Sequence, residues 1–314
     1  MAHVYDDRYG EPNRYRLARC TQCGHLATAP RLDESVLPVL YGTYYPRKGT
    51  SPEQVSRSAA SATAPFARLR RWWQGVNNQG QYLVQPGEVM LDIGCGSGIS
   101  LLEAQALGAQ AFGIEADPNV RPIALALGLN IHFGSLHDDP FPGQRFDLVV
   151  LNQVIEHLPE PDHALRHLRD RLTHSGRIVL VFPNVGSVWR RIAGLRWINW
   201  HIPYHLHHFD RAGFARMADR CGYRVHSTRT ITPNLWTLLQ ARASRIPAQP
   251  GVPHPLWATR PAAADEGKEA RRSAGIKTAL RLLVLLPIAI LNRTLDAVGQ
   301  GDSLMVVLHP KGIR

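Results

Sequence analysis

The sequence is poor in cysteine, in lysine and in long apolar runs. Four cysteines among 314 residues are too few for a disulfide scaffold. The first ten residues contain no apolar stretch, so we expect no secretory signal there. The longest apolar run, 282–291, has ten residues, whereas a membrane-spanning helix needs about 20. These features predict a cytoplasmic protein.

Nearly all of the positive charge comes from arginine. Only four of the 36 basic residues are lysines, and 25 acidic residues leave a net charge of +11. Such a charge suits nucleic acid, because clustered cations release counterions from phosphates. It suits an anionic substrate or a membrane surface equally well. Apart from three short pairs, the arginines are scattered along the chain, so charge alone does not identify the partner.

Short apolar runs alternate with helical patterns from about residue 83 onward. This alternation is typical of βαβ units and a parallel sheet. We therefore predict an α/β fold with a doubly wound, mostly parallel, seven-stranded Rossmann-like sheet. A small N-terminal extension precedes it, and a C-terminal helical insertion comes before the last strand. The predicted strands are Val89–Ile93, Ala111–Ile114, Asn130–Phe133, Phe146–Leu151, Arg177–Phe182, Tyr223–Thr230 and Ser303–Leu308, and the predicted helices are 98–107, 118–127, 161–172 and Arg211–Arg220.

Composition divides the chain into five parts. The insertion is the most distinctive of them, because it contains a stretch rich in proline, alanine and charge, 244–272, which predicts a mobile loop. An apolar helix, 276–293, is predicted after that loop. The five parts are an N-terminal segment, 1–50, a linker and helix, 51–82, a ligand-binding core, 83–232, the insertion, 233–301, and the last core strand with the tail, 302–314.

The string LDIGCGSG, Leu91–Gly98, closes an apolar strand and opens a helix. Its glycines, Gly94, Gly96 and Gly98, permit tight backbone geometry and let a ligand approach the main chain closely. A dinucleotide pyrophosphate requires G-x-G-x-x-G, and the position of the third glycine is Ile99 in this chain. The pattern therefore argues against a nicotinamide cofactor.

Two carboxylates accompany this loop. Asp92 lies two residues before Gly94, where a negative charge is unfavourable beside a pyrophosphate but suits a ligand with an ammonium and a sulfonium group. Glu115 ends the second predicted strand, 21 residues after Gly94, and can accept two hydrogen bonds from vicinal ribose hydroxyls. Both positions indicate a cationic ligand that carries a ribose.

Four segments, in consistent order, resemble the class I S-adenosylmethionine-dependent methyltransferase superfamily. Asp92–Gly98 is similar to its glycine-rich motif and Gly113–Asp117 to its ribose-binding motif, while Phe146–Val150 and Val154–Pro161 match its fourth strand and the segment after it. The resemblance covers about 83–231 plus the last strand, and it implies S-adenosyl-L-methionine as the cofactor. The cofactor-binding residues that it implies are Asp92, Gly94, Cys95, Gly96, Gly98, Glu115, Ala116, Ser135, Leu136, Asn152 and Gln153.

The pair Cys20 and Cys23, followed by glycine, resembles the N-terminal segment of many methyltransferases in this group. There, two Cys-x-x-Cys pairs form a zinc ribbon ahead of the catalytic domain. This chain has only the second pair, so the resemblance implies a partial zinc ribbon. Structural zinc takes four ligands, and His3, His25 or a partner chain would have to complete the site. The alternative is a knuckle without metal.

Three segments compete for the catalytic role. One of them, Val185–Trp200, could form an aromatic and basic lid over an acceptor pocket, and core packing of its tryptophans is the alternative. Gln153–His157 follows the fourth strand, where this superfamily meets the substrate; one quinone-biosynthesis branch holds a divalent metal there with Glu-x-x-Glu-His. The first position is glutamine here, so no metal is predicted. Trp200–Phe209 resembles the Pro-x-His-Leu-x-x-Phe element of the same group. We predict His205 as the general base for a hydroxyl acceptor, with His157 and Tyr204 as further candidates. Purely structural roles for both histidines are the alternative.

The sequence thus predicts an enzyme that moves the methyl group of S-adenosyl-L-methionine onto a hydroxyl of a small-molecule, saccharide or lipid-linked acceptor, by an in-line displacement. The apolar helix 276–293 is a candidate for peripheral membrane contact. A nucleic-acid (RNA) methyltransferase is the first alternative, because of the net charge. Residues 152–155 lack the Asn/Asp-Pro-Pro-Tyr/Phe of amino-methylating DNA enzymes. A non-catalytic S-adenosyl-L-methionine-binding module is the second alternative.

Overall fold

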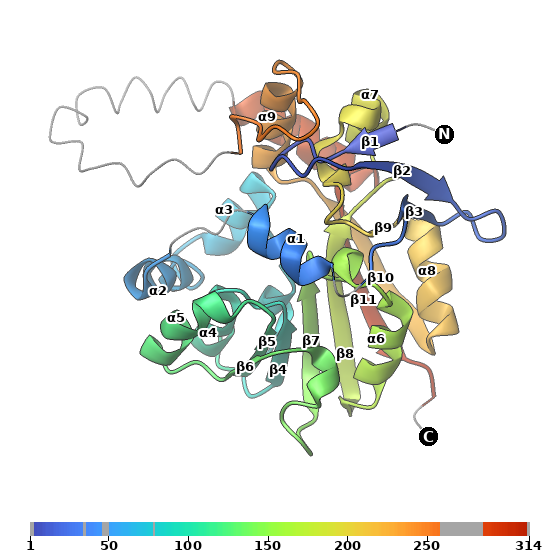
Figure 1. Ribbon diagram of the computed structural model, residues 1–314. Helices are drawn as coiled ribbons and strands as arrows, with labels where there is room; N and C mark the ends of the chain where they lie inside the picture. The colour runs from blue at the N-terminus through green and yellow to red at the C-terminus, as the bar shows by residue number, and fades with distance from the viewer. Residues whose placement is uncertain (1–2, 34–35, 46–49, 78, 258–284, 313–314) are drawn as a thin grey trace, which may run out of the picture.

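A seven-stranded sheet forms the centre of the molecule, with strand order β10–β11–β8–β7–β4–β5–β6 (Figure 1). Neighbouring strands from β6 to β8 are parallel, whereas β11 is antiparallel to both of its neighbours. The predicted α/β fold is therefore confirmed. The strands are β4 (Val89–Ile93), β5 (Gln110–Glu115), β6 (Ile131–Phe133), β7 (Phe146–Asn152), β8 (Leu172–Pro183), β10 (Tyr223–Ile231) and β11 (Ser303–Pro310). This computed structural model describes residues 3–33, 36–45, 50–77, 79–257 and 285–312.

Helices cover both faces of the sheet, as the side-chain alternation of its strands requires. In β4, Leu91 packs in the core that includes α6 (Pro161–Arg169) and α8 (Arg211–Arg220), whereas Met90 packs toward α4 (Ile99–Ala106). Strands buried on both faces read as continuous apolar runs, which is why the sequence pattern located them. The single-turn helices are η1 (Gly80–Leu83), η2 (Pro118–Val120), η3 (Leu136–Asp138), η4 (Ile155–His157), η5 (Gly194–Arg196) and η6 (Ile198–Trp200), and α5 (Arg121–Ala126) and α7 (Val188–Ala193) complete the core.

The N-terminal segment is not a separate module. Its strands β1 (His3–Tyr5), β2 (Arg14–Arg19) and β3 (Leu26–Ala29) form an antiparallel sheet, and its fourth strand is β9 (His207–His208) from the core. In this pairing Leu26 lies opposite His208. The predicted N-terminal segment, 1–50, therefore shares its sheet with the core, because residues close to 180 positions later in the chain complete that sheet.

The region between the N-terminal sheet and the core is more helical than the sequence analysis predicted. A single helix was expected within 51–82, and the structure contains two. The helices of this region are α1 (Leu37–Thr43), α2 (Pro52–Ala60) and α3 (Ala67–Gln74). A capping box at Ser51 begins α2, in which the Ser51 hydroxyl accepts from the Gln54 amide and the Gln54 side chain accepts from the Ser51 amide.

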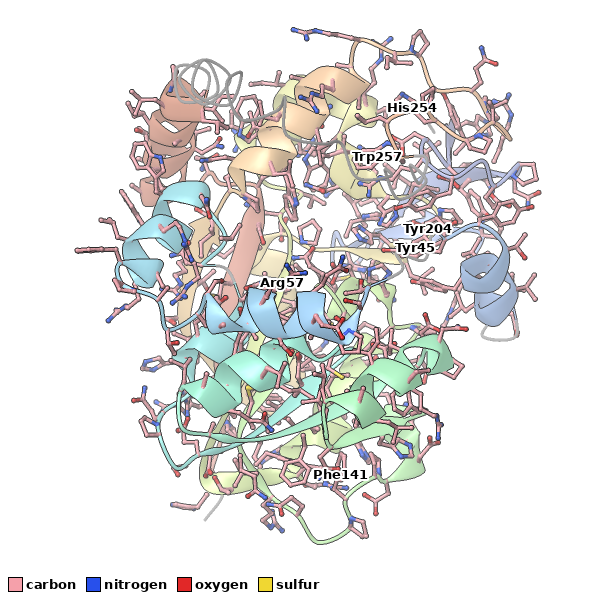
Figure 2. All side chains as sticks on the ribbon, turned by 90° about the vertical axis from the view of Figure 1, so that its left-hand side faces the viewer. Tyr45, Arg57, Phe141, Tyr204, His254 and Trp257 are labelled. Atoms are coloured by element: carbon pink, nitrogen blue, oxygen red, sulfur yellow. The ribbon has the colours of Figure 1, made fainter. Side chains whose placement is uncertain are left out.

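The insertion begins with a helix, α9 (Asn234–Ala243), that the sequence analysis did not predict. The prediction of a mobile loop over 244–272 is wrong for its first part, because 244–257 packs against the N-terminal segment. The Tyr5 hydroxyl donates to the Ala248 carbonyl at 2.9 Å, and the Arg8 guanidinium lies 4.4 Å above the Trp257 ring. Figure 2 shows Trp257 and His254 on this side of the molecule. The rest of the predicted loop, and 276–284 of the apolar helix, lie outside the described residues, and a helix occupies 285–297.

Within the described part of the chain, no helix combines the length and the apolar character that crossing a membrane requires.

Candidate active site

The glycine-rich turn after β4 has the geometry that its sequence predicts. Gly94, Gly96 and Gly98 all have positive φ, between 56° and 81°. At Gly98, where α4 begins, a Cβ atom would lie 2.3 Å from the Leu129 side chain, whereas a Cβ at Gly96 would meet nothing within 4 Å. The positive φ and the close Leu129 side chain both favour glycine at 98, and Gly96 exposes its backbone to open space where a ligand can approach.

Glu115, at the carboxyl end of β5, holds this turn. Its Oε2 accepts a hydrogen bond from the Gly96 amide at 2.7 Å, and its Oε1 accepts from the Asp117 amide at 2.8 Å. A carboxylate offers about four acceptor positions, so two remain for ribose hydroxyls. Glu115, which is predicted to bind the ribose of the cofactor, therefore also fixes the glycine turn. The spacing along the sequence did not reveal this second role.

Asp92 is buried inside the turn. The Ser100 hydroxyl donates to its Oδ2, while Oδ1 is buried without a hydrogen-bond partner. Burial raises the pKa of the carboxyl from 3.8 to about 7. A buried polar atom without a partner is costly, and a cationic ligand beside Asp92 would remove that cost. The donor set therefore fits a ligand with ammonium and sulfonium groups.

The remaining predicted cofactor residues surround the same strand ends. Gln153 has a φ of 57°, an uncommon conformation for a residue other than glycine, and its Nε2 is buried without a partner. Asn152 is engaged by η1, because its Oδ1 accepts from the Gly80 amide and its Nδ2 donates to Gln81.

The Ser135 hydroxyl accepts from the His137 amide and so caps η3, which begins at Leu136. Cys95 is buried in the turn and Ala116 follows β5 directly.

His205 lies beyond β8, in the loop that contains β9, and its ring orientation is fixed. Its Nδ1 is 2.9 Å from the Asn199 carbonyl. A carbonyl only accepts, so Nδ1 donates and Nε2 keeps its lone pair. Burial, with the charges of His157, His208 and Arg8, lowers the pKa of His205 well below its usual value, so the ring is neutral at neutral pH.

Nε2 of His205 lies between His201, whose Nδ1 is 3.4 Å away, and Glu156. The distance from His205 Nε2 to Glu156 Oε1 is 3.9 Å, and the Leu206 amide donates to the Glu156 carbonyl at 2.8 Å, which fixes the two segments together. Glu156 is 1% exposed, and neither of its carboxylate oxygens has a hydrogen-bond partner. Burial raises its pKa from 4.5 to about 8. The sequence left a substrate role and a structural role open for Glu156, and its lack of partners in the interior makes it a candidate functional group.

His157 has a different environment from His205. Its Nδ1 is 2.7 Å from the Tyr41 hydroxyl, and the ring also forms a hydrogen bond to the Tyr204 backbone. Burial lowers its pKa to about 4. Nδ1 of His157 is therefore engaged by Tyr41, so His157 remains the second candidate for the general base.

Aromatic rings from the N-terminal segment close the site. The rings of Tyr9, Tyr41 and Tyr45 each lie between 5.2 and 5.5 Å from that of Tyr204, and Tyr45 and Tyr204 are adjacent in Figure 2. The Tyr204 hydroxyl and His201 Nε2 are buried without partners. Sequence reasoning missed Tyr9 and gave Tyr41 and Tyr45 no role at the site, because no local pattern connects residues so far apart in the chain.

Asp302, at the start of β11, supports the histidine loop. It is 3% exposed and accepts hydrogen bonds from the Trp197 indole at 2.9 Å and the Asn199 amide at 3.0 Å. The backbone carbonyl of Asn199 in turn accepts the hydrogen bond from His205 Nδ1. The tryptophans Trp197 and Trp200 are buried, so core packing, rather than a lid, accounts for them.

Two groups bear on metal binding. Within the described chain, one set of three ligand atoms lies mutually within 4.8 Å, and it comes from Glu156, His157 and His205. An ion there would compete with Tyr41 for His157. Cys20 is exposed and Cys23 half-buried, and His25, a proposed further ligand, is instead hydrogen-bonded to His207 at 3.0 Å.

Fold and site together define a class I methyltransferase that uses S-adenosyl-L-methionine. The strand order, the glycine turn after β4 and the carboxylate after β5 are the features of that class. Residues 66–228 match the family model described as a methyltransferase domain. The chain belongs to this methyltransferase family.

Curated relatives match a shorter part of the chain. A ubiquinone biosynthesis O-methyltransferase of Cereibacter sphaeroides (strain ATCC 17025) is 32% identical over 130 residues, which are 39% of this chain and 53% of the relative. The enzyme of the same name from Rhodopseudomonas palustris (strain HaA2) is 29% identical over 136 residues, 39% of this chain and 51% of the relative. The chain thus spans about half the length of these relatives.

Solved structures are similar at lower sequence identity. A SAM-dependent methyltransferase from Archaeoglobus fulgidus is 16% identical, with a TM-score of 0.43, over 88% of this chain and 99% of that structure. An S-adenosylmethionine-dependent methyltransferase from Mesorhizobium loti is 14% identical, with a TM-score of 0.45, over 79% of this chain and 99% of that structure.

Proposed function

We propose that the protein transfers a methyl group to a hydroxyl oxygen of a small-molecule acceptor, with His205 as the general base. The single observation that carries the proposal is the buried pair of Glu156, without hydrogen-bond partners, and His205, whose Nδ1 donates to Asn199 so that Nε2 carries the lone pair. This pair follows β7 and β8, at the carboxyl ends of the strands, where parallel α/β sheets bind ligands.

The cofactor residues lie next to this pair. A Cβ atom at Gly94 would lie 2.7 Å from Val154 Cγ2, so the glycine turn contacts the segment that carries Glu156. Asp92 would face the cationic end of S-adenosyl-L-methionine and Glu115 its ribose. The cofactor supplies an electrophilic methyl group, and the chain has to position the acceptor oxygen in line with it and receive its proton.

Proton transfer follows from the ring geometry of His205. Because the Asn199 carbonyl accepts from Nδ1, the lone pair lies on Nε2, and it can take the acceptor's hydroxyl proton once the acceptor replaces the 3.4 Å contact of Nε2 with His201 Nδ1. The imidazolium that results would be stabilised by the Glu156 carboxylate, whose Oε1 is 3.9 Å away. With its pKa raised to about 8, this carboxyl is mostly protonated at pH 7 and becomes an anion as the pH rises. We therefore expect methyl transfer to accelerate as the pH rises through about 8.

The weak basicity of His205 restricts the acceptor. A phenolic hydroxyl has a pKa of about 10, whereas an aliphatic hydroxyl is far less acidic. An imidazole whose pKa is lowered by burial deprotonates the former far more readily. The wall formed by Tyr9, Tyr41, Tyr45 and Tyr204 suits a planar ring. Among small-molecule, saccharide and lipid-linked acceptors, an acidic ring hydroxyl is favoured, which agrees with the O-methyltransferase names of the relatives.

A labelled-methyl transfer assay with a panel of ring hydroxyl and saccharide acceptors tests the proposal. His205→Ala should lower the rate by about 10²–10⁴ with cofactor affinity nearly unchanged. His205→Asn retains a donor for the Asn199 carbonyl without a base, so it separates catalysis from folding. His226→Ala, at an exposed histidine of β10, is the control. Full activity of the asparagine variant would return His205 to a structural role.

Further parts of the proposal concern the chain around this site. Residues 83–232 and 302–314 form the proposed catalytic unit, and 1–50 serves as part of the acceptor site. Zinc at Cys20 and Cys23 requires ligands from another chain or from a rearranged His25. The net charge of +11 supports an RNA methyltransferase as the second candidate, which transfer of label to RNA would reveal. A cytoplasmic location and membrane contact through 276–293 remain predictions.

A further inference from the structure

The short helix α3 exposes an apolar face that no described part of the protein covers. Phe66, which immediately precedes the helix, is 82% exposed, Leu69 is 61% exposed and Trp72 is 46% exposed. These residues follow one another at intervals of three, so they lie along one side of the helix. Scattered exposed apolar residues are ordinary, but an aligned set with two aromatic rings marks an interaction surface.

The backbone at Phe66 strengthens this interpretation. Its φ of 58° lies in the left-handed region, which is unfavourable for a bulky aromatic residue. Packing does not compensate for this conformation, because the ring is exposed to solvent. An aromatic ring held outward by an unfavourable backbone conformation is explained if the ring has a partner outside the chain.

Two further elements extend the exposed face. The Arg293 guanidinium donates to the Trp72 carbonyl at 2.6 Å, and the Asn234 side chain donates to the Trp73 carbonyl at 3.0 Å. Helix 285–297 and α9 are therefore fixed beside α3, and Figure 2 shows helix 285–297 above α3 on the left of the view. They contribute Ile290, 53% exposed, and Leu235, 60% exposed. We name the set Phe66, Leu69, Trp72, Leu235 and Ile290 the α3 face.

The charge beside the α3 face is positive. Arg68 and Arg70 are exposed on α3, although Arg70 also donates to the Ser61 carbonyl at 3.2 Å, and the helix contains no acidic residue. Arg71 does not contribute, because its guanidinium turns inward to the Ala62 carbonyl and lies 3.8 Å above the Tyr82 ring. The one acidic residue of the described helix 285–297 is Asp296, which is paired with Arg293 at the base of the face.

The geometry points to an anionic phospholipid surface as the partner of the α3 face. Phenylalanine, leucine and tryptophan on one side of a short helix, with arginines beside them, is the composition of helices that lie in the membrane interface. Each arginine near an anionic surface adds attraction, and the aromatic rings enter the boundary between headgroups and acyl chains. This inference is independent of the proposed acceptor, and it adds α3 and α9 to the membrane contact expected from 276–293, to which Ile290 belongs.

Flotation of the full chain with vesicles tests the inference. At low salt, the protein should float with phosphatidylcholine vesicles that contain phosphatidylglycerol and should remain at the bottom with phosphatidylcholine alone. The double variant Phe66→Ser/Leu69→Ser should lower the vesicle-bound to free ratio at least about tenfold, because two apolar anchors are lost. Arg68→Gln/Arg70→Gln should lower the same ratio at least about tenfold, since each arginine contributes near the surface.

Matched controls distinguish binding through the α3 face from non-specific adsorption of exposed apolar side chains. Leu125→Ser/Ile192→Ser removes two apolar side chains that are 76% and 70% exposed on other elements, and it should float like the wild type. Equal loss in this control, or wild-type protein that stays unbound with both vesicles, would overturn the inference. So would a dimer in light scattering, without lipid, that Phe66→Ser/Leu69→Ser dissociates, because the face would then bind a second copy of this chain.

Discussion

Replacing Glu156 with glutamine should stabilise the protein while it removes activity. The carboxyl is 1% exposed, without hydrogen-bond partners, and its pKa is raised from 4.5 to about 8 by burial. The folded state therefore binds more protons than the unfolded state between these two values, so stability falls as the pH rises through that window. Glutamine has nearly the same shape and does not titrate, so it removes this loss.

The magnitude follows from the two pKa values. At pH 7 the carboxyl must hold a proton 2.5 pH units above its unfolded pKa, at about 1.36 kcal/mol for each unit. The cost to the folded state is about 3 kcal/mol at pH 7 and below about 1 kcal/mol at pH 5. Glu156→Gln should raise the free energy of unfolding by these amounts, since both neutral groups lack partners equally.

Urea unfolding followed by tryptophan fluorescence at pH 5 and pH 7 measures the difference. Glu160→Gln, at a side chain that is 57% exposed, is the control and should change neither value. Methyl transfer by Glu156→Gln should fall and should lose its acceleration through pH 8, because no carboxylate forms beside His205. If the free energy of unfolding of Glu156→Gln does not rise at pH 7, or rises equally at both pH values, Glu156 is not a buried, neutral carboxyl.

Two further predictions concern the cofactor turn. Burial raises the pKa of Asp92 to about 7, and a cationic ligand favours its ionised form. Calorimetry should therefore show that the affinity for S-adenosyl-L-methionine falls by up to about tenfold for each pH unit below pH 7. Asp92→Asn should flatten this dependence. Equal slopes would contradict the contact. Glu115→Ala should weaken cofactor binding at least about tenfold, because ribose hydrogen bonds and the support of the Gly96 amide are lost together; an unchanged dissociation constant would remove Glu115 from the site.

The core sheet could be predicted because its signals are local. β4 was predicted with its observed bounds, and the strands around it differ by a few residues at most, apart from β8, whose predicted start at Arg177 lies five residues after Leu172. The N-terminal sheet could not be predicted in the same way. Its strands are three to six residues long, and its last partner, β9, has only two residues. A pairing so short and so distant leaves no periodic pattern in the sequence.

The candidate site, like the fold, was predictable only where its signals are local in the sequence. The glycine turn, Asp92 and Glu115 lie within one βαβ unit, so their spacing carried the prediction. The choice between His157 and His205 depends on Tyr41, which lies 116 residues before His157 and occupies its Nδ1. The tautomer of His205 depends on the Asn199 carbonyl, in a loop whose placement Asp302 supports from the far end of the chain. Long-range contacts of this kind assign the roles that residue type alone left open.

Two glutamates of the interior show how partners, and not burial, identify the functional group. Glu103 is 4% exposed, yet it accepts hydrogen bonds from the Gln81 amide and the Tyr82 hydroxyl, each at 2.7 Å. Glu156 is 1% exposed and accepts none. A carboxyl satisfied by its neighbours stabilises packing, whereas one that lacks partners lowers stability and is retained for what it binds. Asp92 Oδ1 and Gln153 Nε2 share this condition among the predicted cofactor residues, so the proposed methyl donor and acceptor sites both contain buried polar atoms that a ligand could satisfy.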